Sequence, residues 1–252
     1  MSDVTHGPVA ADRSELDRQG LATLEAGPRW CLPMAEVLRR GIGHVLAATP
    51  ASVCLALDNG DIQIWADSSS EVRRVLEEHP AWEFVMLAGP GLGQEACKVW
   101  GLPEGRIEFF SVAAYTAGTP LPVSSALEIR TLGVEWAETV RDHYTHPEFF
   151  PIEEIRRRCA AGTITGGFED GELVGYIGSH AEGSMGMLEV FEGHRHQGYA
   201  TALESAKIDE HLSHGWTPWA QIFADNVASI NLQHKLGLSL TPADEQCFLS
   251  IN

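Results

Sequence analysis

The chain has 252 residues, 44% of them hydrophobic, which is enough for one large domain or two small ones with real cores. Its 35 acidic residues against 17 basic ones give a formal charge of -18, so nucleic acid and anionic membranes are not expected partners, because both need a basic surface. The apolar runs are too short to span a membrane and the first residues lack a signal-peptide pattern, so a cytoplasmic location is expected.

The acidity allows two interpretations. It can keep the protein soluble, or its negative field can attract a cationic amine. The five cysteines form no C-x-x-C pair and their number is odd, which predicts reduced, mostly buried thiols and no metal site.

In the first half, residues 1–28 are expected to form an N-terminal tail or cap with one short helix between Ser14 and Leu24. The following stretch alternates helical and strand patterns, and Asn59 and Gly60 predict a tight hairpin turn. The predicted helices lie at 33–40, 68–78 and 95–100, and the predicted strands at 43–48, 52–57, 62–66, 84–88 and 106–115.

The segment from Gly89 to Gln94 is rich in glycine and follows a predicted strand. It fails as a dinucleotide fingerprint, because Gln94 stands where the last glycine is needed and Pro90 has no N–H. It also lacks the Lys-Ser/Thr pair of a Walker loop. A structural turn is the expected role, with degenerate cofactor binding as the alternative.

Prolines at 120 and 122 predict a linker over 118–126, because closely spaced prolines resist both helix and central strand. Beyond it, strands are predicted at 127–130, 164–169, 173–180, 184–190, 219–223 and 246–251, and helices at 133–144, 152–161 and 199–211 and around Ser229.

The stretch from Arg195 to Ala200 stands where the strand at 184–190 has ended and an amphipathic helix begins. The first turn of a helix carries unpaired N–H groups and a partial positive charge, so it can hold a diphosphate. Gly198 would let the anion approach the backbone, and Arg195 would add a positive charge. The alternative is a strand-to-helix turn that simply needs a glycine.

The pattern Arg-x-x-Gly-x-Ala at 195–200 resembles the coenzyme A pyrophosphate loop of the GNAT superfamily of N-acetyltransferases. Residues 224–238 resemble the other end of that fold, where the family reads roughly Asn-x-x-Ser/Ala-x-x-Leu-Tyr-x-Lys-Leu-Gly-Phe. The whole arrangement is also similar to the glycine N-acyltransferase family, and equally to bacterial acetyltransferases with such a C-terminal domain.

The resemblance implies an α/β (α+β) fold with tandem GNAT-like domains, each a mixed, mostly antiparallel sheet flanked by helices. The first, at 29–117, would be degenerate, and the second, at 127–252, would alone carry the cofactor motif. Acetyl-CoA would be the cosubstrate, with no metal. The residues that the resemblance places on acetyl-CoA are Leu188, Val190, Arg195, His196, Gln197, Gly198, Tyr199, Ala200, Thr201 and Asn226. For Asn226, capping of the helix ahead of Ser229 is the alternative.

Acetyl transfer needs a neutral amine, an acceptor for its proton and stabilisation of the departing thiolate. The tyrosine that often protonates the thiolate in the family is replaced here by Gln233, which cannot act as an acid. The glycine N-acyltransferases place a glutamate base where this chain has Ser184, so the candidates are Glu189 and Glu182. Otherwise the amine loses its proton to solvent.

The sequence therefore predicts transfer of an acetyl group from acetyl-CoA to a small primary amine by direct attack, without a covalent enzyme intermediate, since no cysteine lies in the motif region. The alternative is a non-catalytic acyl-CoA-binding sensor or interaction module. A dinucleotide-dependent enzyme is a third and weaker hypothesis. A homodimer is compatible with the sequence, and the acceptor is left open because fold likeness does not fix it.

Overall fold

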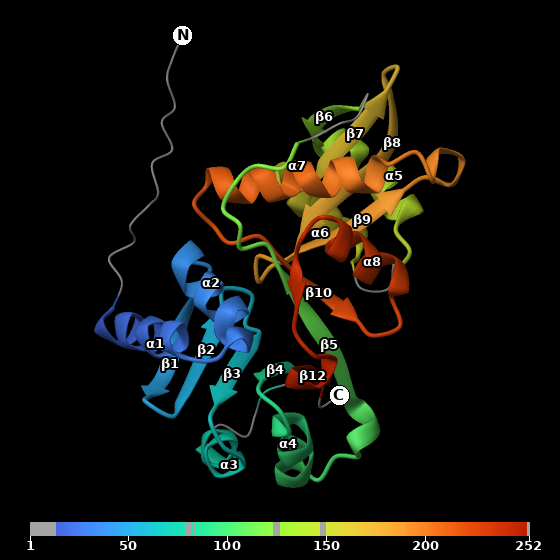
Figure 1. Ribbon diagram of the computed structural model, residues 1–252. Helices are drawn as coiled ribbons and strands as arrows, with labels where there is room; N and C mark the ends of the chain where they lie inside the picture. The colour runs from blue at the N-terminus through green and yellow to red at the C-terminus, as the bar shows by residue number, and fades with distance from the viewer. Residues whose placement is uncertain (1–13, 79–81, 83, 123–126, 147–149, 251–252) are drawn as a thin grey trace. The chain divides into compact units, whose positions relative to one another are not determined.

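The computed structural model describes residues 14–78, 82, 84–122, 127–146 and 150–250 (Figure 1). By its contacts the chain divides into two units. The first comprises Met1–Val112, Ile222–Asp225 and Thr241–Asn252, and the second comprises Ala113–Gln221 and Asn226–Leu240.

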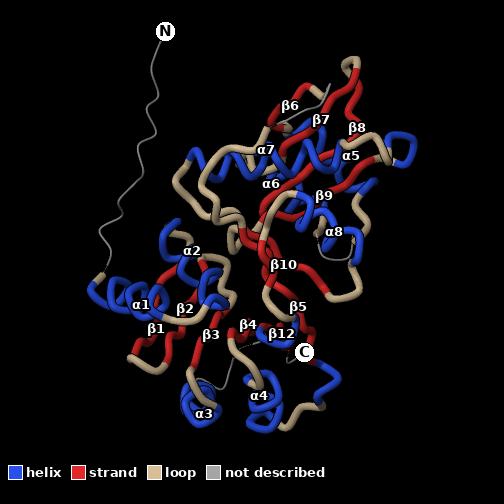
Figure 2. The backbone as a smooth tube through the Cα atoms, viewed as in Figure 1, coloured by secondary structure: helices blue, strands red, loops and turns tan. Residues whose placement is uncertain are grey.

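The first unit contains a sheet in the order β1, β2, β3, β4, β12, β5, whose strands are red in Figure 2. Among its described strand pairs, β3 and β4 are parallel and the others are antiparallel. Its strands are β1 (Gly43–Thr49), β2 (Ser52–Leu57), β3 (Ile62–Ala66), β4 (Phe84–Ala88), β5 (Ile107–Ala114) and β12 (Gln246–Ser250). Every residue of β2 and β3 is buried, as expected for continuous apolar strands covered on both faces.

Four helices accompany this sheet: α1 (Glu15–Ala26), α2 (Leu32–Arg40), α3 (Ser69–Glu78) and α4 (Leu92–Trp100). Apolar side chains of α3 and α4 form one core with Ile62 and Ile64 of β3. Helix α1 packs on β1 and β2, where Gly20 lets the helix lie close against Val45. Residues 15–26, predicted as part of a tail or cap, thus contribute to the core of this unit.

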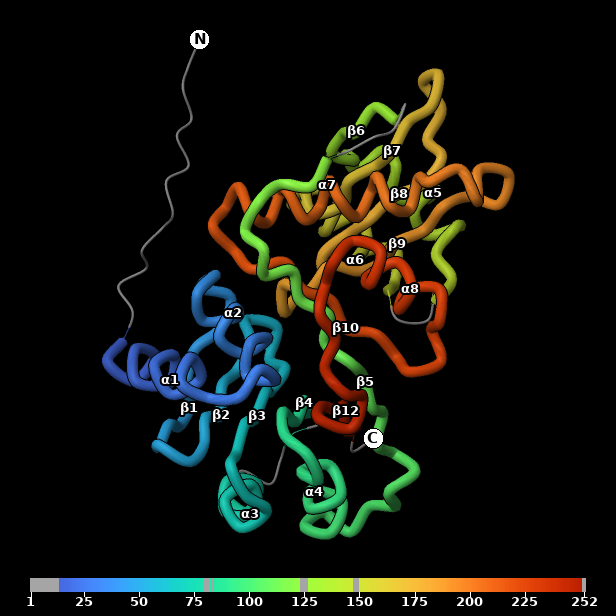
Figure 3. The backbone as a smooth tube through the Cα atoms, viewed as in Figure 1, coloured from blue at the N-terminus to red at the C-terminus, as the bar shows by residue number. Residues whose placement is uncertain are grey.

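The second unit is built on an antiparallel series of strands, β6 (Glu128–Thr131), β7 (Thr165–Glu169), β8 (Glu172–Ser179) and β9 (Met185–Val190), followed by β10 (Trp219–Phe223), which runs parallel to β9. Strand β11 (Ser239–Leu240) pairs with the last two residues of β5. The tube drawing in Figure 3 lets the chain be followed through these strands.

Its helices are α5 (Ala137–His143), α6 (Ile152–Ala160), α7 (Tyr199–Ser213) and α8 (Val227–Lys235). Tyr176 packs with α5 and α6, whereas its neighbour Ile177 packs with α7. Since successive strand residues point to opposite faces, α7 covers one face of this sheet and α5 and α6 cover the other.

Short 3-10 helices lie at Arg29–Cys31, Glu104–Arg106, Val134–Trp136, Glu192–His194 and Ala243–Glu245. The predicted mixed α/β fold, its strands and its helices are confirmed, with three differences. Strand β11 is not predicted, α4 begins at Leu92, and the helix predicted at 133–144 is a 3-10 turn followed by the shorter α5.

The predicted domain from 127 to 252 differs from the observed units, because β12 pairs with β4 and β5 of the first unit. Strand pairing between segments far apart in sequence leaves no local signal at the strand itself. All five cysteines are buried and none is in a disulfide, as the sequence predicts. Among the residues described, no helix combines the length and apolar character needed to cross a membrane.

Candidate functional site

Strands β9 and β10 begin side by side and then separate. Their parallel register consists of one pair, Ala220 opposite Met185. From Gly186 onward β9 is paired with β8 on one side, and the register with β10 does not continue. One edge of β9 therefore lies open within this sheet, and such an edge offers hydrogen bonds to an extended ligand.

The backbone groups on that open edge can be assigned from their alternation. The Phe191 N–H donates to the Val174 carbonyl of β8, at 2.9 Å. Because alternate residues of a strand direct their backbone groups to opposite neighbours, Leu188 and Val190 face away from β8. A β-bulge precedes them, with Met187 at φ 53°. Both residues belong to the set that the family resemblance places on acetyl-CoA.

The loop after β9 leads to the start of α7. Gly198 has φ 85°, and no side chain caps the helix there. The first helical hydrogen bond runs from the Ala202 N–H to the Gly198 carbonyl, so the N–H groups of residues 199–201 have no partner within the described structure. A Cβ built on Gly198 would meet nothing within 4 Å, so this helix start is open.

Two elements hold the helix start in place. The Tyr199 hydroxyl donates to Glu169 at the end of β7, and this hydrogen bond raises the pKa of Tyr199. The imidazole Nδ1 of His194 lies 3.3 Å from Oε2 of the same carboxylate. Sheet and loop are thereby tied together. The remaining predicted loop residues, His196 and Gln197, are exposed beside this start.

Two cationic side chains flank the helix start. Arg195 Nε donates to the Val190 carbonyl at 3.1 Å, which directs the guanidinium along the end of β9. Lys235 Nζ, from the end of α8, donates to Thr201 Oγ1 in the first turn of α7 at 3.0 Å. Sequence reasoning missed Lys235 as a site residue, although it belongs to the Lys-Leu-Gly segment that carries the resemblance.

Asn226 stands at the start of α8, and its Oδ1 accepts a hydrogen bond from the Ser229 N–H at 3.0 Å. This is the capping role that the sequence offered as the alternative. The side-chain amide nitrogen is left for a ligand, because the cap uses the oxygen.

Both candidate bases already accept hydrogen bonds. Glu189, on β9, accepts from the backbone N–H of Thr145 at 2.9 Å and from its hydroxyl. Glu182, in the turn between β8 and β9, accepts from the hydroxyl of the buried Ser184. Each carboxylate therefore orders a neighbouring loop or turn.

Gln233 is 2% exposed and its amide donates to Glu204 of α7. Burial raises the pKa of Glu204 to about 7, although the hydrogen bond from Gln233 opposes this. Glu204 Oε2 and Gln233 Oε1 have no partner in the described structure. The side chain that replaces the family's tyrosine is thus engaged with α7, while the neighbouring His234 is exposed.

In the first unit α3 connects the parallel strands β3 and β4, as α7 connects β9 and β10 in the second, but β3 and β4 do not separate. They remain paired from Ile62 opposite Val85 to Trp65 opposite Ala88. The start of α3 is capped by the hydroxyl of Ser68, which accepts from the Glu71 N–H at 3.4 Å. The connection between β3 and α3 therefore has neither an open strand edge nor an uncapped helix start beside it.

Within the segment at 89–94, Gly93 lies inside α4, where a Cβ would stand 2.7 Å from the Cys247 sulfur. Gly91, at φ 75°, precedes the first residue of α4. Close packing and a turn account for these glycines, in agreement with the predicted structural role.

Residues 129–238 match the family model described as Acetyltransferase (GNAT) family. A search of curated proteins found no match. Among solved structures, a Drosophila protein shares 17% identity over 93% of this chain and 87% of its own, with a TM-score of 0.63.

Two bacterial structures share the fold. A GCN5-related N-acetyltransferase-like protein from Streptococcus suis has 15% identity over 94% of this chain and 98% of its own, with a TM-score of 0.55. A GCN5-related N-acetyltransferase from Kribbella flavida has 13% identity over 95% of this chain and 96% of its own, with a TM-score of 0.52. At these identities the likeness shows the fold, while the family match supports acyl transfer from an acyl-CoA in general. The chain thus has a mixed α/β fold in which residues 129–238 match the model of the acetyltransferase (GNAT) family.

Proposed function

We propose that this protein transfers an acetyl group from acetyl-CoA to a small primary amine by direct attack. The observation that carries the proposal is the open edge of β9 leading to the uncapped start of α7. A diphosphate placed there would meet the N–H groups of residues 199–201 and the charges of Arg195 and Lys235.

The pantetheine arm would run back along β9 from this start. Leu188 and Val190 would supply its backbone partners, and the amide nitrogen of Asn226 would add a side-chain donor from α8. The predicted set of acetyl-CoA residues is thereby kept, with Lys235 added to it.

Direct attack is favoured over a covalent enzyme intermediate because no activated thiol is available. Burial raises the pKa of all five cysteines, to about 12 for Cys31, Cys54 and Cys247. A buried thiol with a raised pKa supplies almost no thiolate near neutral pH. The formal charge of -18 would favour the approach of a cationic amine.

The second candidate function is a non-catalytic acyl-CoA sensor. Gln233 supports it, because this side chain is buried against Glu204 and has no proton to give to a departing thiolate. Binding of acetyl-CoA without thiol release would distinguish the sensor from the enzyme.

The first test measures the melting temperature with and without acetyl-CoA. At about 100 times Kd, binding should stabilise the protein by about 2.7 kcal/mol. Gly198→Glu should abolish this effect, because it puts bulk and negative charge at the diphosphate position. Gly215→Glu is the matched control, since Gly215 also has positive φ, 75°, and open space around its Cβ position, but it follows the other end of α7.

A Gly198→Glu protein that keeps the full shift in melting temperature would show that the diphosphate lies elsewhere.

The second test measures free thiol with acetyl-CoA and a panel of amines, for which tyramine, histamine, cadaverine, spermidine and lysine are suitable probes. Thiol release supports the transferase, and stabilisation without release supports the sensor.

A further inference from the structure

A histidine lies at the closed end of the gap between β9 and β10. His180 directly follows β8, and its N–H donates to the Ser184 carbonyl at 2.9 Å. Its ring lies against Gly186 of β9, where any Cβ would collide with Nε2. Gly186 follows Met185, the β9 residue that pairs with β10, so the imidazole stands where the two strands begin to separate.

The surroundings keep this imidazole neutral. The ring is half-buried and stacks on Phe150, with centroids 5.7 Å apart. Burial lowers the pKa of His180, the Glu182 carboxylate raises it, and the Arg158 guanidinium lowers it again. The charged and titratable groups on the adjoining elements are Glu182 of the same turn, Arg158 and Glu154 of α6, Tyr144 and His146 after α5, and Glu189 of β9.

Neither ring nitrogen of His180 has a hydrogen-bond partner within the described part of the chain. Arg158, by contrast, is held by Glu154 at 2.7 Å and by the Ser179 carbonyl at 2.5 Å. Glu182 and Glu189 accept hydrogen bonds from Ser184 and Thr145. Each of these carboxylates thus has one oxygen engaged in ordering a neighbouring segment, whereas the His180 imidazole can accept a proton without giving up a hydrogen bond within the described structure.

The length of β9 places a thioester beside this ring. From Val190, next to the start of α7, back to Gly186 is four residues, or roughly 13 Å of strand at about 3.3 Å per residue. An extended pantetheine arm is comparable in length. A coenzyme held by its diphosphate at the helix start would thus bring its sulfur and acyl carbon close to Gly186.

We infer that His180 is the base that takes the proton of the attacking amine; this rests on the proposed function. The amine nitrogen attacks the thioester carbonyl carbon, the N–C bond forms and the C–S bond breaks. The proton leaves the nitrogen, which becomes acidic on bonding to carbon, for His180 Nε2. Coenzyme A departs as the thiolate with the electron pair of the C–S bond and takes a proton from solvent, and the imidazolium returns its own proton to solvent.

The test compares His180→Gln with the wild type and with His234→Gln, which removes an exposed imidazole on α8. His180→Gln should keep the rise in melting temperature with acetyl-CoA, because it leaves the diphosphate position and β9 untouched. For the amine in the panel that the wild type turns over fastest, kcat/KM should fall at least about 100-fold, as expected for loss of a general base. Protonation of the amine itself lowers kcat/KM towards acidic pH in every variant. The further decline of wild-type kcat/KM that protonation of a general base adds should be absent in His180→Gln and present in His234→Gln.

Unchanged kcat/KM and an unchanged pH profile in His180→Gln would overturn the assignment and leave the proposed function standing. No thiol release by the wild type with any amine would overturn the proposed function, and the base with it. If His180→Gln does not fold, histidine NMR of the wild type decides. The His180 signal should titrate below the ordinary range of a histidine and shift when acetyl-CoA is added, and a signal that acetyl-CoA leaves unchanged would overturn the assignment.

Discussion

Glu204 shows how one buried carboxyl group makes stability depend on pH. It is 2% exposed, and burial raises its pKa from 4.5 to about 7. A carboxyl whose pKa is raised by folding stabilises the folded state fully at pH values below its pKa in the unfolded chain. This stabilisation is lost as the pH rises through its pKa in the folded protein. The wild type should therefore lose stability as pH rises between those two values.

Glu204→Gln should remove this dependence, because the amide cannot ionise and its carbonyl can still accept from Gln233. The wild type should lose on the order of 3 kcal/mol relative to the variant between pH 4.5 and about 7. Urea unfolding across this range measures the difference. Glu172→Gln, at the exposed first residue of β8, is the control, and parallel curves for wild type and Glu204→Gln would contradict the prediction.

At this scale, the sequence predicts what is local. The uncapped helix start at Gly198 and its glycine conformation follow from neighbouring residues, and the structure has both. The partner of Gln233 could not be predicted, because Glu204 lies 29 residues away and occupies a helix position where a carboxylate is ordinarily exposed. His180 gave no signal either, since its surroundings come from β9, the residue at 150 and α6.

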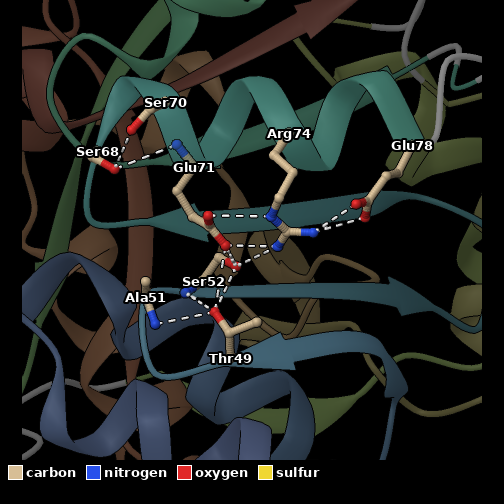
Figure 4. Close-up of polar contacts among 8 residues, drawn as sticks. All are labelled: Thr49, Ala51, Ser52, Ser68, Ser70, Glu71, Arg74 and Glu78. Atoms are coloured by element: carbon tan, nitrogen blue, oxygen red, sulfur yellow. Dashed lines mark hydrogen bonds and ion pairs between the residues drawn. The ribbon is translucent and has the colours of Figure 1, made fainter.

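Among the elements, α3 is fixed to the β1–β2 turn by polar contacts rather than by its apolar face alone. Figure 4 shows Glu71 between Arg74 of its own helix and Ser52 of β2. The hydrogen bonds from Arg74 and Ser52 lower the pKa of Glu71 to about 2. Thr49 completes the group, with its hydroxyl accepting from the Ser52 N–H at 3.0 Å.

Glu71→Gln should destabilise the protein at neutral pH by about 1 kcal/mol, since the pair is partly exposed. A carboxyl whose pKa is lowered by folding contributes stability above its unfolded value, 4.5, and that contribution is lost as pH falls towards about 2. The difference from wild type should therefore shrink on acidification, as followed by urea unfolding. Glu78→Gln is the matched control, because Glu78 binds the same Arg74 but its side chain is 52% exposed, and an equal loss from both variants would contradict the argument.

The sequence predicts which segments are strands or helices, but it does not predict the register in which the strands pair. Apolar runs and turn residues predict the strands. The turn at Asp170 and Gly171 joins β7 and β8, and both residues have the positive φ values expected of a tight hairpin turn. The bulge at Met187 and the single pair between β9 and β10 depend on pairing across the sheet. The open edge therefore leaves no signal within the sequences of β9 and β10 themselves.

At the scale of the whole molecule, the sheet of the first unit is completed by β12, a strand from the end of the chain. The sequence places its residues in a C-terminal domain, but β12 lies between β4 and β5 in the sheet of the first unit. Cys247 and Leu249 are fully buried in the core that α3 and α4 share. The first unit is therefore incomplete without the last strand of the chain.

A protease site inserted after Gly118 tests this dependence. Gly118 is exposed, with φ 68° and open space around its Cβ position, so the insertion should not disturb the fold. After cleavage the C-terminal fragment still supplies β12, which pairs with β4 from Gln246 opposite Ala88 to Ser250 opposite Phe84. The two fragments should therefore elute together in size-exclusion chromatography, at the volume of the uncut protein, and separate only in denaturant. Fragments that separate in native buffer would show that the two units fold independently and that β12 contributes little to the first unit. Joint elution would mean that a cut at the predicted linker divides the sequence but not the sheet of the first unit. Each unit must then be studied in the full chain.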